Sequence, residues 1–145
     1  MGISNFFSKA DKEKIIQAIK DAERETSGEI RLHLESRCKG DPLERAIKVF
    51  EKLKMHHTRL RNGTLIFVAT DDRKFAIFGD EGINEIVPDN FWEDVKEEMG
   101  QHFAKNEFAL GVSRGIFLIG EKLKEFFTYQ DDDINELSDD ISMGE

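Results

Sequence analysis

The sequence lacks the features that would stabilise a small protein without a sizeable core. Its 145 residues include one cysteine, Cys38, so no internal disulfide can form, and no Cys/His cluster has zinc-site spacing. No apolar run approaches the roughly 20 residues that a membrane-spanning helix needs. The first residues lack a basic start followed by a long apolar stretch, so no secretory signal is predicted. We expect a soluble, cytoplasmic protein that is stabilised by a buried core.

Basic residues are fewer than acidic residues. The chain has 21 Lys and Arg residues against 30 Asp and Glu residues, which gives a net charge of −9. Residues 131–145 hold seven of the acidic residues and no basic one, which leaves −2 for residues 1–130. No basic stripe with interleaved aromatic residues is present, which argues against nucleic-acid binding. The sequence predicts one domain over residues 1–130 and an acidic tail over residues 131–145.

Hydrophobic periodicity predicts helices around a small number of strands. Apolar and polar residues alternate over Glu29–Glu35, which predicts a strand, and His33 should face outward or cap a strand edge. The run Leu65–Ala69 has no polar residue, so both faces of this second strand should be covered. A third strand is predicted over Phe75–Phe78. Helices are predicted from Ser8 to about Glu25, from Pro42 to Leu53, from Pro88 to Phe103 and from Phe108 to Phe126.

The connections between these elements predict the topology. The first two strands are joined through a helix, which makes them parallel, and the short connection at residues 71–73 makes the second and third strands an antiparallel hairpin. The sheet is therefore mixed and mostly parallel, with helices on both faces. The predicted fold is a three-layer α/β/α sandwich.

Acidic residues gather at both ends of the predicted sheet. The groups are Asp71, Asp72 and Glu107 where the parallel strands finish, and Glu29, Asp80 and Asp89 at the opposite end. Converging carboxylates are the ligands that Ca²⁺ and Mg²⁺ require, and open α/β sheets usually bind ligands at the carboxyl ends of their strands. All six residues are candidate metal ligands. The sequence does not decide which end of the sheet binds the metal. Turn formation and helix capping explain several of them without a ligand.

Three arginines are candidate phosphate ligands. Arg59 and Arg61 lie in the turn before the second strand, and Arg73 lies at the hairpin tip. The planar fork of a guanidinium group suits an oxyanion. The alternative is that these side chains are solvated loop residues. No nucleophile and base form a recognised motif, so no catalytic residue is assigned.

Several short motifs together resemble the TPM domain family, which is named after a thylakoid lumen protein, a photosystem repair factor and a nematode receptor modulator. The resemblance is carried by residues 27–30, 59–68, 72–73, 79–89 and 106–108. The ending at residues 129–137 resembles a soluble bacterial branch of the family. It implies an α/β/α sandwich, divalent-metal binding, most often of Ca²⁺, and a phosphatase activity in some members.

The family's acidic positions match Asp72, Asp89 and Glu107 in this sequence. The chain departs from the family at Glu107, where Asp is frequent, and at Asp80, where many members have Gly. The residues and the resemblance together favour a Ca²⁺- or Mg²⁺-binding domain with weak metal-dependent hydrolysis of phosphomonoesters. The alternative is a non-enzymatic module whose strand-end loops and acidic tail bind another protein.

Overall fold

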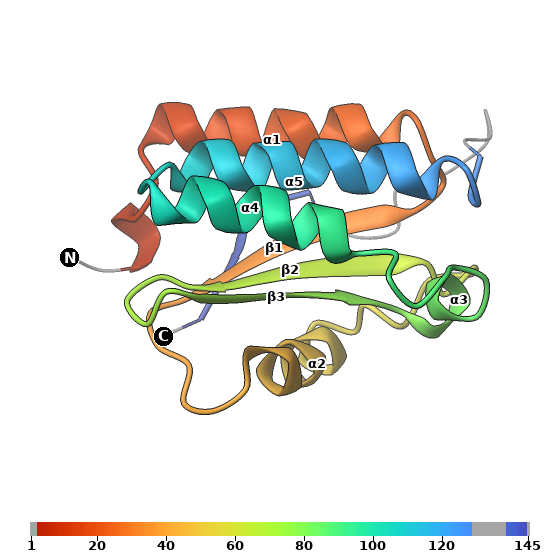
Figure 1. Ribbon diagram of the computed structural model, residues 1–145, viewed down its shortest axis with the longest axis horizontal. Helices are drawn as coiled ribbons and strands as arrows, with labels where there is room; N and C mark the ends of the chain where they lie inside the picture. The colour runs from red at the N-terminus through yellow and green to blue at the C-terminus, as the bar shows by residue number, and fades with distance from the viewer. Residues whose placement is uncertain (1–2, 129–138, 145) are drawn as a thin grey trace.

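A computed structural model describes residues 3–128 and 139–144 (Figure 1). A short 3₁₀ helix over Ile3–Asn5 precedes the main elements. These are α1 (Lys9–Glu23), β1 (Glu29–Glu35), α2 (Pro42–Lys52), β2 (Gly63–Ala69), β3 (Lys74–Gly79), α3 (Glu81–Asn84), α4 (Glu93–Ala104), α5 (Phe108–Leu123) and β4 (Ser142–Met143). None of the helices in the described residues is long and apolar enough to cross a membrane.

The sheet has the strand order β3-β2-β1-β4. β1 and β2 are parallel over seven residue pairs, from Glu29 opposite Gly63 to Glu35 opposite Ala69. β2 and β3 form the predicted antiparallel hairpin, and β4 lies parallel to β1 at the other edge. The prediction of a mixed, mostly parallel sheet is confirmed.

Helices cover both faces of this sheet, as Figure 1 shows: α1, α4 and α5 lie on one side and α2 lies on the other. β2 is buried along its whole length because its side chains enter two different cores. Ile66 and Val68 face the three-helix layer, whereas Leu65, Phe67 and Ala69 pack with α2. This arrangement confirms the three-layer α/β/α sandwich.

The helices α1 and α2 each begin after a residue whose side chain caps the first turn. Ser8 caps α1 by accepting the Asp11 N–H at 3.0 Å, and Asp41 caps α2 before a first-turn proline. The prediction that a helix begins at Pro88 is wrong, because α4 begins at Glu93. The Pro88 carbonyl instead accepts the Phe91 N–H in a turn, so the proline starts a loop.

The edge strand β4 changes the surroundings of β1. Gly144 donates its N–H to the Leu34 carbonyl at 2.8 Å, and the residues of β4 lie opposite His33 and Leu34. Of the two alternatives for His33, an outward-facing side chain is wrong, because the side chain is buried beside Ser142 and stacks on Phe67. β4 belongs to the segment predicted as an acidic tail, and residues 131–138 of that tail lie outside the described residues.

Candidate functional site

The loops that leave β1 and β2 are joined at the carboxyl end of the parallel pair. Thr70 and Asp71 donate their N–H groups to the carbonyls of Glu35 and Ser36, each at 2.8 Å. Asp72 accepts the Cys38 N–H at 2.7 Å through Oδ2. The side chains of Asp71 and Asp72 are exposed. The two carboxylates therefore face solvent from a backbone that is held in place by the neighbouring loop.

The break between α4 and α5 reaches the same end of the sheet. Arg73, at the hairpin tip, donates from Nη2 to Oδ1 of Asn106 at 2.9 Å. Both residues have left-handed backbones, with φ of 54° for Arg73 and 61° for Asn106. Glu107 follows directly, and its Oε1 lies 3.0 Å from Nδ1 of His102. The structure thus brings together the loops that carry Asp71, Asp72 and Glu107.

These strand-end loops carry hard oxygen donors, which fit the ligand preference of Ca²⁺ and Mg²⁺. Asp72 uses one carboxylate oxygen for the Cys38 N–H, and a carboxylate has a second. Over residues 3–128 and 139–144, no three Asp, Glu, His or Cys side chains stand close enough together to form a ready-made metal site. Cation binding here would require the exposed side chains to move toward one another.

At the opposite end of the sheet, the predicted acidic residues do not form one group. Asp80 is buried and is held by Arg61, with Nε to Oδ2 at 2.7 Å and Nη2 to Oδ1 at 3.0 Å. Glu29 is buried at the start of β1. Asp89 is exposed in the turn before α4, and Arg59 is exposed in the turn before β2. An ion at Asp80 would therefore have to displace a guanidinium group.

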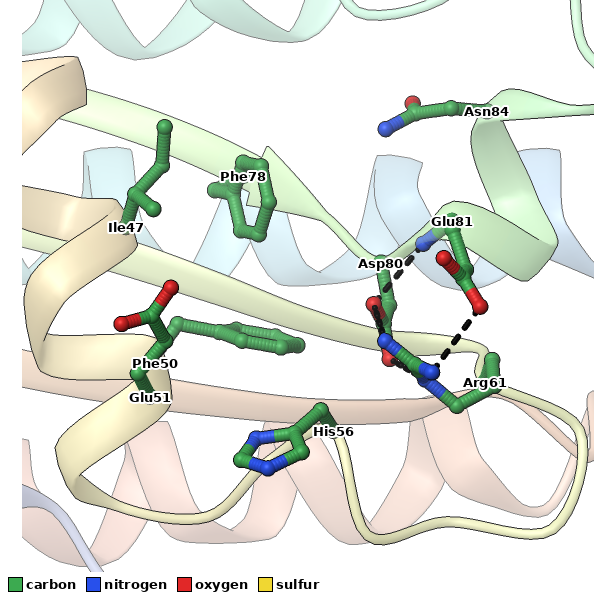
Figure 2. Close-up of a pocket in the computed structure, with 9 residues that line it drawn as sticks. All are labelled: Ile47, Phe50, Glu51, His56, Arg61, Phe78, Asp80, Glu81 and Asn84. Carbon is green, nitrogen blue, oxygen red and sulfur yellow. Dashed lines mark hydrogen bonds and ion pairs between the residues drawn. The ribbon is translucent and has the colours of Figure 1, made fainter.

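A pocket of about 490 Å³ lies beside this Arg61–Asp80 pair, as Figure 2 shows. α2 forms one wall, the connection from α2 to β2 forms the floor, and the end of β3 with the start of α3 forms the other wall. The lining residues are Ile47, Phe50, Glu51, His56, Arg61, Phe78, Asp80, Glu81 and Asn84. Its residues do not include the acidic residues of the strand-end loops.

Sequence reasoning missed a buried polar chain that begins in β4. Ser142 Oγ lies 2.8 Å from Nδ1 of His33, and Nε2 of His33 lies 3.0 Å from Oε2 of Glu35. Arg45 of α2 then donates two hydrogen bonds to the Glu35 carboxylate, at 2.8 and 2.6 Å. The only local signal was a polar face on β1, which did not identify the partners.

The protonation states of His33 and Glu35 set the direction of the hydrogen bonds between these residues. Burial lowers the pKa of His33, which favours the neutral imidazole. Burial raises the pKa of Glu35, but the hydrogen bonds from Arg45 and His33 outweigh burial and leave that pKa lowered. Glu35 is therefore ionised and accepts from His33 Nε2–H, which leaves Nδ1 to accept the Ser142 hydroxyl.

A second buried carboxyl links α1 to the edge of the sheet. Glu23 accepts the Ile30 N–H at 3.0 Å through Oε2. Burial, the hydrogen bond to Asp139 and the charges of Asp139 and Glu29 raise the pKa of Glu23 to about 10. Glu23 is therefore protonated at neutral pH, and its carboxyl group is hydrogen-bonded to the side chain of Asp139.

The architecture defines the chain as an α/β/α sandwich protein with acidic loops at the carboxyl ends of its parallel strands. The sequence profile of the TPM domain matches residues 3–122. The chain belongs to the TPM domain family, which confirms the resemblance seen in the sequence. The match spans the sheet from β1 to β3 and all the helices except the end of α5.

The chain is similar in structure to proteins from three bacteria. The NMR structure of the BA42 protein from the psychrophilic bacterium Bizionia argentinensis is 43% identical, with a TM-score of 0.92 over 99% of both chains. The N-terminal domain of the cg2496 protein from Corynebacterium glutamicum is 16% identical, with a TM-score of 0.67 over 88% of this chain and 80% of that one. The N-terminal domain of a P. gingivalis protein is 18% identical, with a TM-score of 0.70 over 88% and 83%. The last two similarities show the shared fold, and no curated protein matches the chain.

Proposed function

We propose that the protein binds a divalent cation, Ca²⁺ or Mg²⁺, in the strand-end loops that carry Asp71, Asp72 and Glu107. The observation that carries this proposal is the hydrogen bond between Arg73 and Asn106, since it ties the hairpin tip to the start of α5. Two loops 33 residues apart in sequence thereby present exposed carboxylates at one end of the sheet. The TPM family resemblance matches three acidic positions, of which Asp72 and Glu107 lie at this end of the sheet and Asp89 lies at the opposite end.

The charge at the two ends of the sheet supports this choice of end. Arg61 already neutralises Asp80 through two hydrogen bonds, whereas Asp71 makes no side-chain hydrogen bond or ion pair within the described residues. An exposed carboxylate that makes no ion pair has more to gain from a divalent ion. Affinity should be modest, with a Kd of about 10⁻⁴ to 10⁻³ M, because the ligands are exposed and not gathered beforehand.

Hydrolysis of phosphomonoesters is the second part of the proposal, and the family resemblance supports it. A cation bound at such loops would polarise a phosphoryl oxygen and make a bound water more acidic. Arg73 carries a guanidinium group in the same loops, and its Cζ lies 5.9 Å from the centre of the Phe108 ring. This contact and the Asn106 hydrogen bond hold the fork at the hairpin tip, where it can orient an oxyanion.

The experiment is a Ca²⁺ titration of the metal-stripped protein, followed by backbone amide NMR shifts. We expect saturable shifts at Asp71, Asp72 and Glu107, and at least about tenfold weaker binding in Asp72→Asn and Glu107→Gln. Glu81→Gln is the matched control, because Glu81 is an exposed carboxylate at the other end of the sheet. Flat shifts at millimolar Ca²⁺ and Mg²⁺, or shifts confined to Glu81 and Asp89, would contradict the proposal.

The activity has its own test. The protein is assayed with p-nitrophenyl phosphate in the presence of Ca²⁺, of Mg²⁺, and of a chelator. We expect hydrolysis that depends on the cation and falls in Asp72→Asn. Cation binding without hydrolysis would remove the phosphatase part and retain the binding site.

A further inference from the structure

The pocket beside Arg61 and Asp80 has the size and shape of a small-molecule site. Its volume of about 490 Å³ lies within the range of roughly 300–1,000 Å³ that is typical of ligand pockets. It opens at the amino ends of the parallel strands, away from the loops of Asp71, Asp72 and Glu107. A ligand there would be independent of the divalent cation proposed above.

One side of the pocket is apolar and aromatic. Phe50 and Phe78 meet edge to face, with ring centroids 5.0 Å apart, and Ile47 extends this surface along α2. Phe50 is buried, whereas Phe78 and Ile47 are only half-buried and so present surface to the cavity. This wall suits the hydrocarbon part of a ligand, and the ring faces attract a cation.

The charged groups that line the pocket are mostly negative. Three carboxylates, Glu51, Asp80 and Glu81, stand against one guanidinium, Arg61. Figure 2 shows Glu51 on the α2 side of the pocket and the other three residues across from it. Within the part of the chain that the structure describes, the Glu51 side chain has no hydrogen bond or ion pair. The pocket therefore has an excess of negative charge with one carboxylate ready to pair.

Arg61 is not available to an anion in this pocket. Its Nε and Nη2 donate to Asp80, and its Nη1 lies 2.9 Å from Oε1 of Glu81. All three guanidinium nitrogens are thus directed at carboxylates. A phosphate would have to displace these partners and would then face Glu51 as well. The predicted phosphate role of Arg61 is untested, and its surroundings favour a cation.

We propose that this pocket binds a small organic ammonium ion with an apolar or aromatic body. The ammonium group pairs with Glu51, the carboxylate that has no partner within the described residues, and the hydrocarbon body packs on Ile47, Phe50 and Phe78. The charge supplies selectivity over neutral and anionic molecules, and the apolar wall supplies selectivity over inorganic cations.

Three probes of one shape and different charge test the proposal. These are 2-phenylethylammonium, the neutral 2-phenylethanol and the anionic 3-phenylpropionate, each titrated into the full chain and followed by amide NMR shifts. A chelator is present throughout, so a result here does not depend on the divalent-cation site. We expect saturable shifts at Glu51, Phe78 and Glu81 with the ammonium probe, and at least about tenfold weaker binding of the other two.

Variants test the assigned roles. Glu51→Gln should weaken binding of the ammonium probe at least about threefold. Phe78→Leu should also weaken its binding, because it removes the aromatic ring and leaves an apolar wall. Glu44→Gln is the matched control, since Glu44 is an exposed glutamate of the same helix that does not line the pocket. The proposal is overturned if the neutral or anionic probe binds as tightly as the ammonium, if no probe saturates, or if Glu44→Gln and Glu51→Gln have equal effects.

Discussion

Arg61 reaches across from the turn before β2 and holds the buried carboxylate of Asp80 with two hydrogen bonds, at 2.7 and 3.0 Å. Asp80 also accepts the Glu81 N–H at 2.8 Å and caps α3. Arg61 itself has a left-handed backbone, with φ of 51°. One carboxylate therefore joins a strained turn, the end of β3 and the start of a helix.

Asp80→Asn should destabilise the protein by about 1–3 kcal/mol in urea unfolding, because it removes a charge-assisted pair from a carboxyl group that is only 3% exposed. The amide keeps an oxygen for the cap, so the loss reports mainly on the Arg61 pair. Glu81→Gln is the control: Glu81 pairs with the same arginine, but its side chain is 61% exposed and should matter much less. Equal losses in the two variants would show that burial does not strengthen this pair.

The raised pKa of Glu23 predicts a pH dependence with a definite sign. The folded state holds the Glu23 proton up to about pH 10, whereas the unfolded chain releases it near the ordinary glutamate pKa of 4.5. The unfolding free energy from this group is therefore greatest below pH 4.5 and decreases as the pH rises from there toward 10.

Glu23→Gln should remove this decrease of the unfolding free energy with rising pH. The amide retains an oxygen for the Ile30 N–H and can donate to Asp139, and it does not titrate. We expect the variant to be more stable than the parent by more than about 1 kcal/mol at pH 8, and to differ little at pH 4. Thermal unfolding at both pH values measures the difference. A variant that is less stable at pH 8 would show that Glu23 is ionised in the folded protein.

The hydrogen bond from Ser142 to His33 predicts how β4 is retained. Ser142→Ala leaves the buried Nδ1 of His33 without its donor and should loosen the strand. The readout is amide hydrogen exchange at Gly144, whose N–H bonds to Leu34, and it should become at least about fivefold faster. Ser142→Thr keeps the hydroxyl and is the control. Unchanged exchange in the alanine variant would mean that backbone pairing alone holds β4.

Local patterns predicted the parts of the fold that depend on local sequence. The alternation in β1 and the continuous apolar run in β2 identified both strands, and the short connection at residues 71–73 identified the hairpin. The break between the last two long helices was also predicted, and topology placed it at the end of the sheet where the parallel strands finish. The structure adds its contact with Arg73. These features depend on periodicity and turn chemistry, which a single sequence displays.

Long-range pairings were not predictable in the same way. Ser142 lies 109 residues from His33, and no local pattern connects a short C-terminal segment to the edge of β1. Asp80 lies 19 residues from Arg61, so the sequence showed a basic turn without its neutralising partner. The burial of His33 and the charge of the pocket both follow from such pairings. Candidate binding residues therefore needed the structure before their ionic partners could be counted.

The close approach of α4 and α5 predicts opposite effects for two glycine substitutions. A Cβ on Gly115 would lie 2.5 Å from the sulfur of Met99, which is fully buried, so Gly115→Ala must push the two helices apart or displace that side chain. A Cβ on Gly100, within α4, would meet nothing within 4 Å. Gly100→Ala should therefore stabilise the protein by about 0.5–1 kcal/mol, the usual gain of alanine over glycine in a helix. Gly115→Ala should destabilise it by about 1–3 kcal/mol despite the same gain in helix propensity. Urea unfolding of both variants measures the two changes in stability. If both substitutions stabilise the protein, the Met99 side chain can move aside with little loss of stability, and the contact between α4 and α5 does not require glycine.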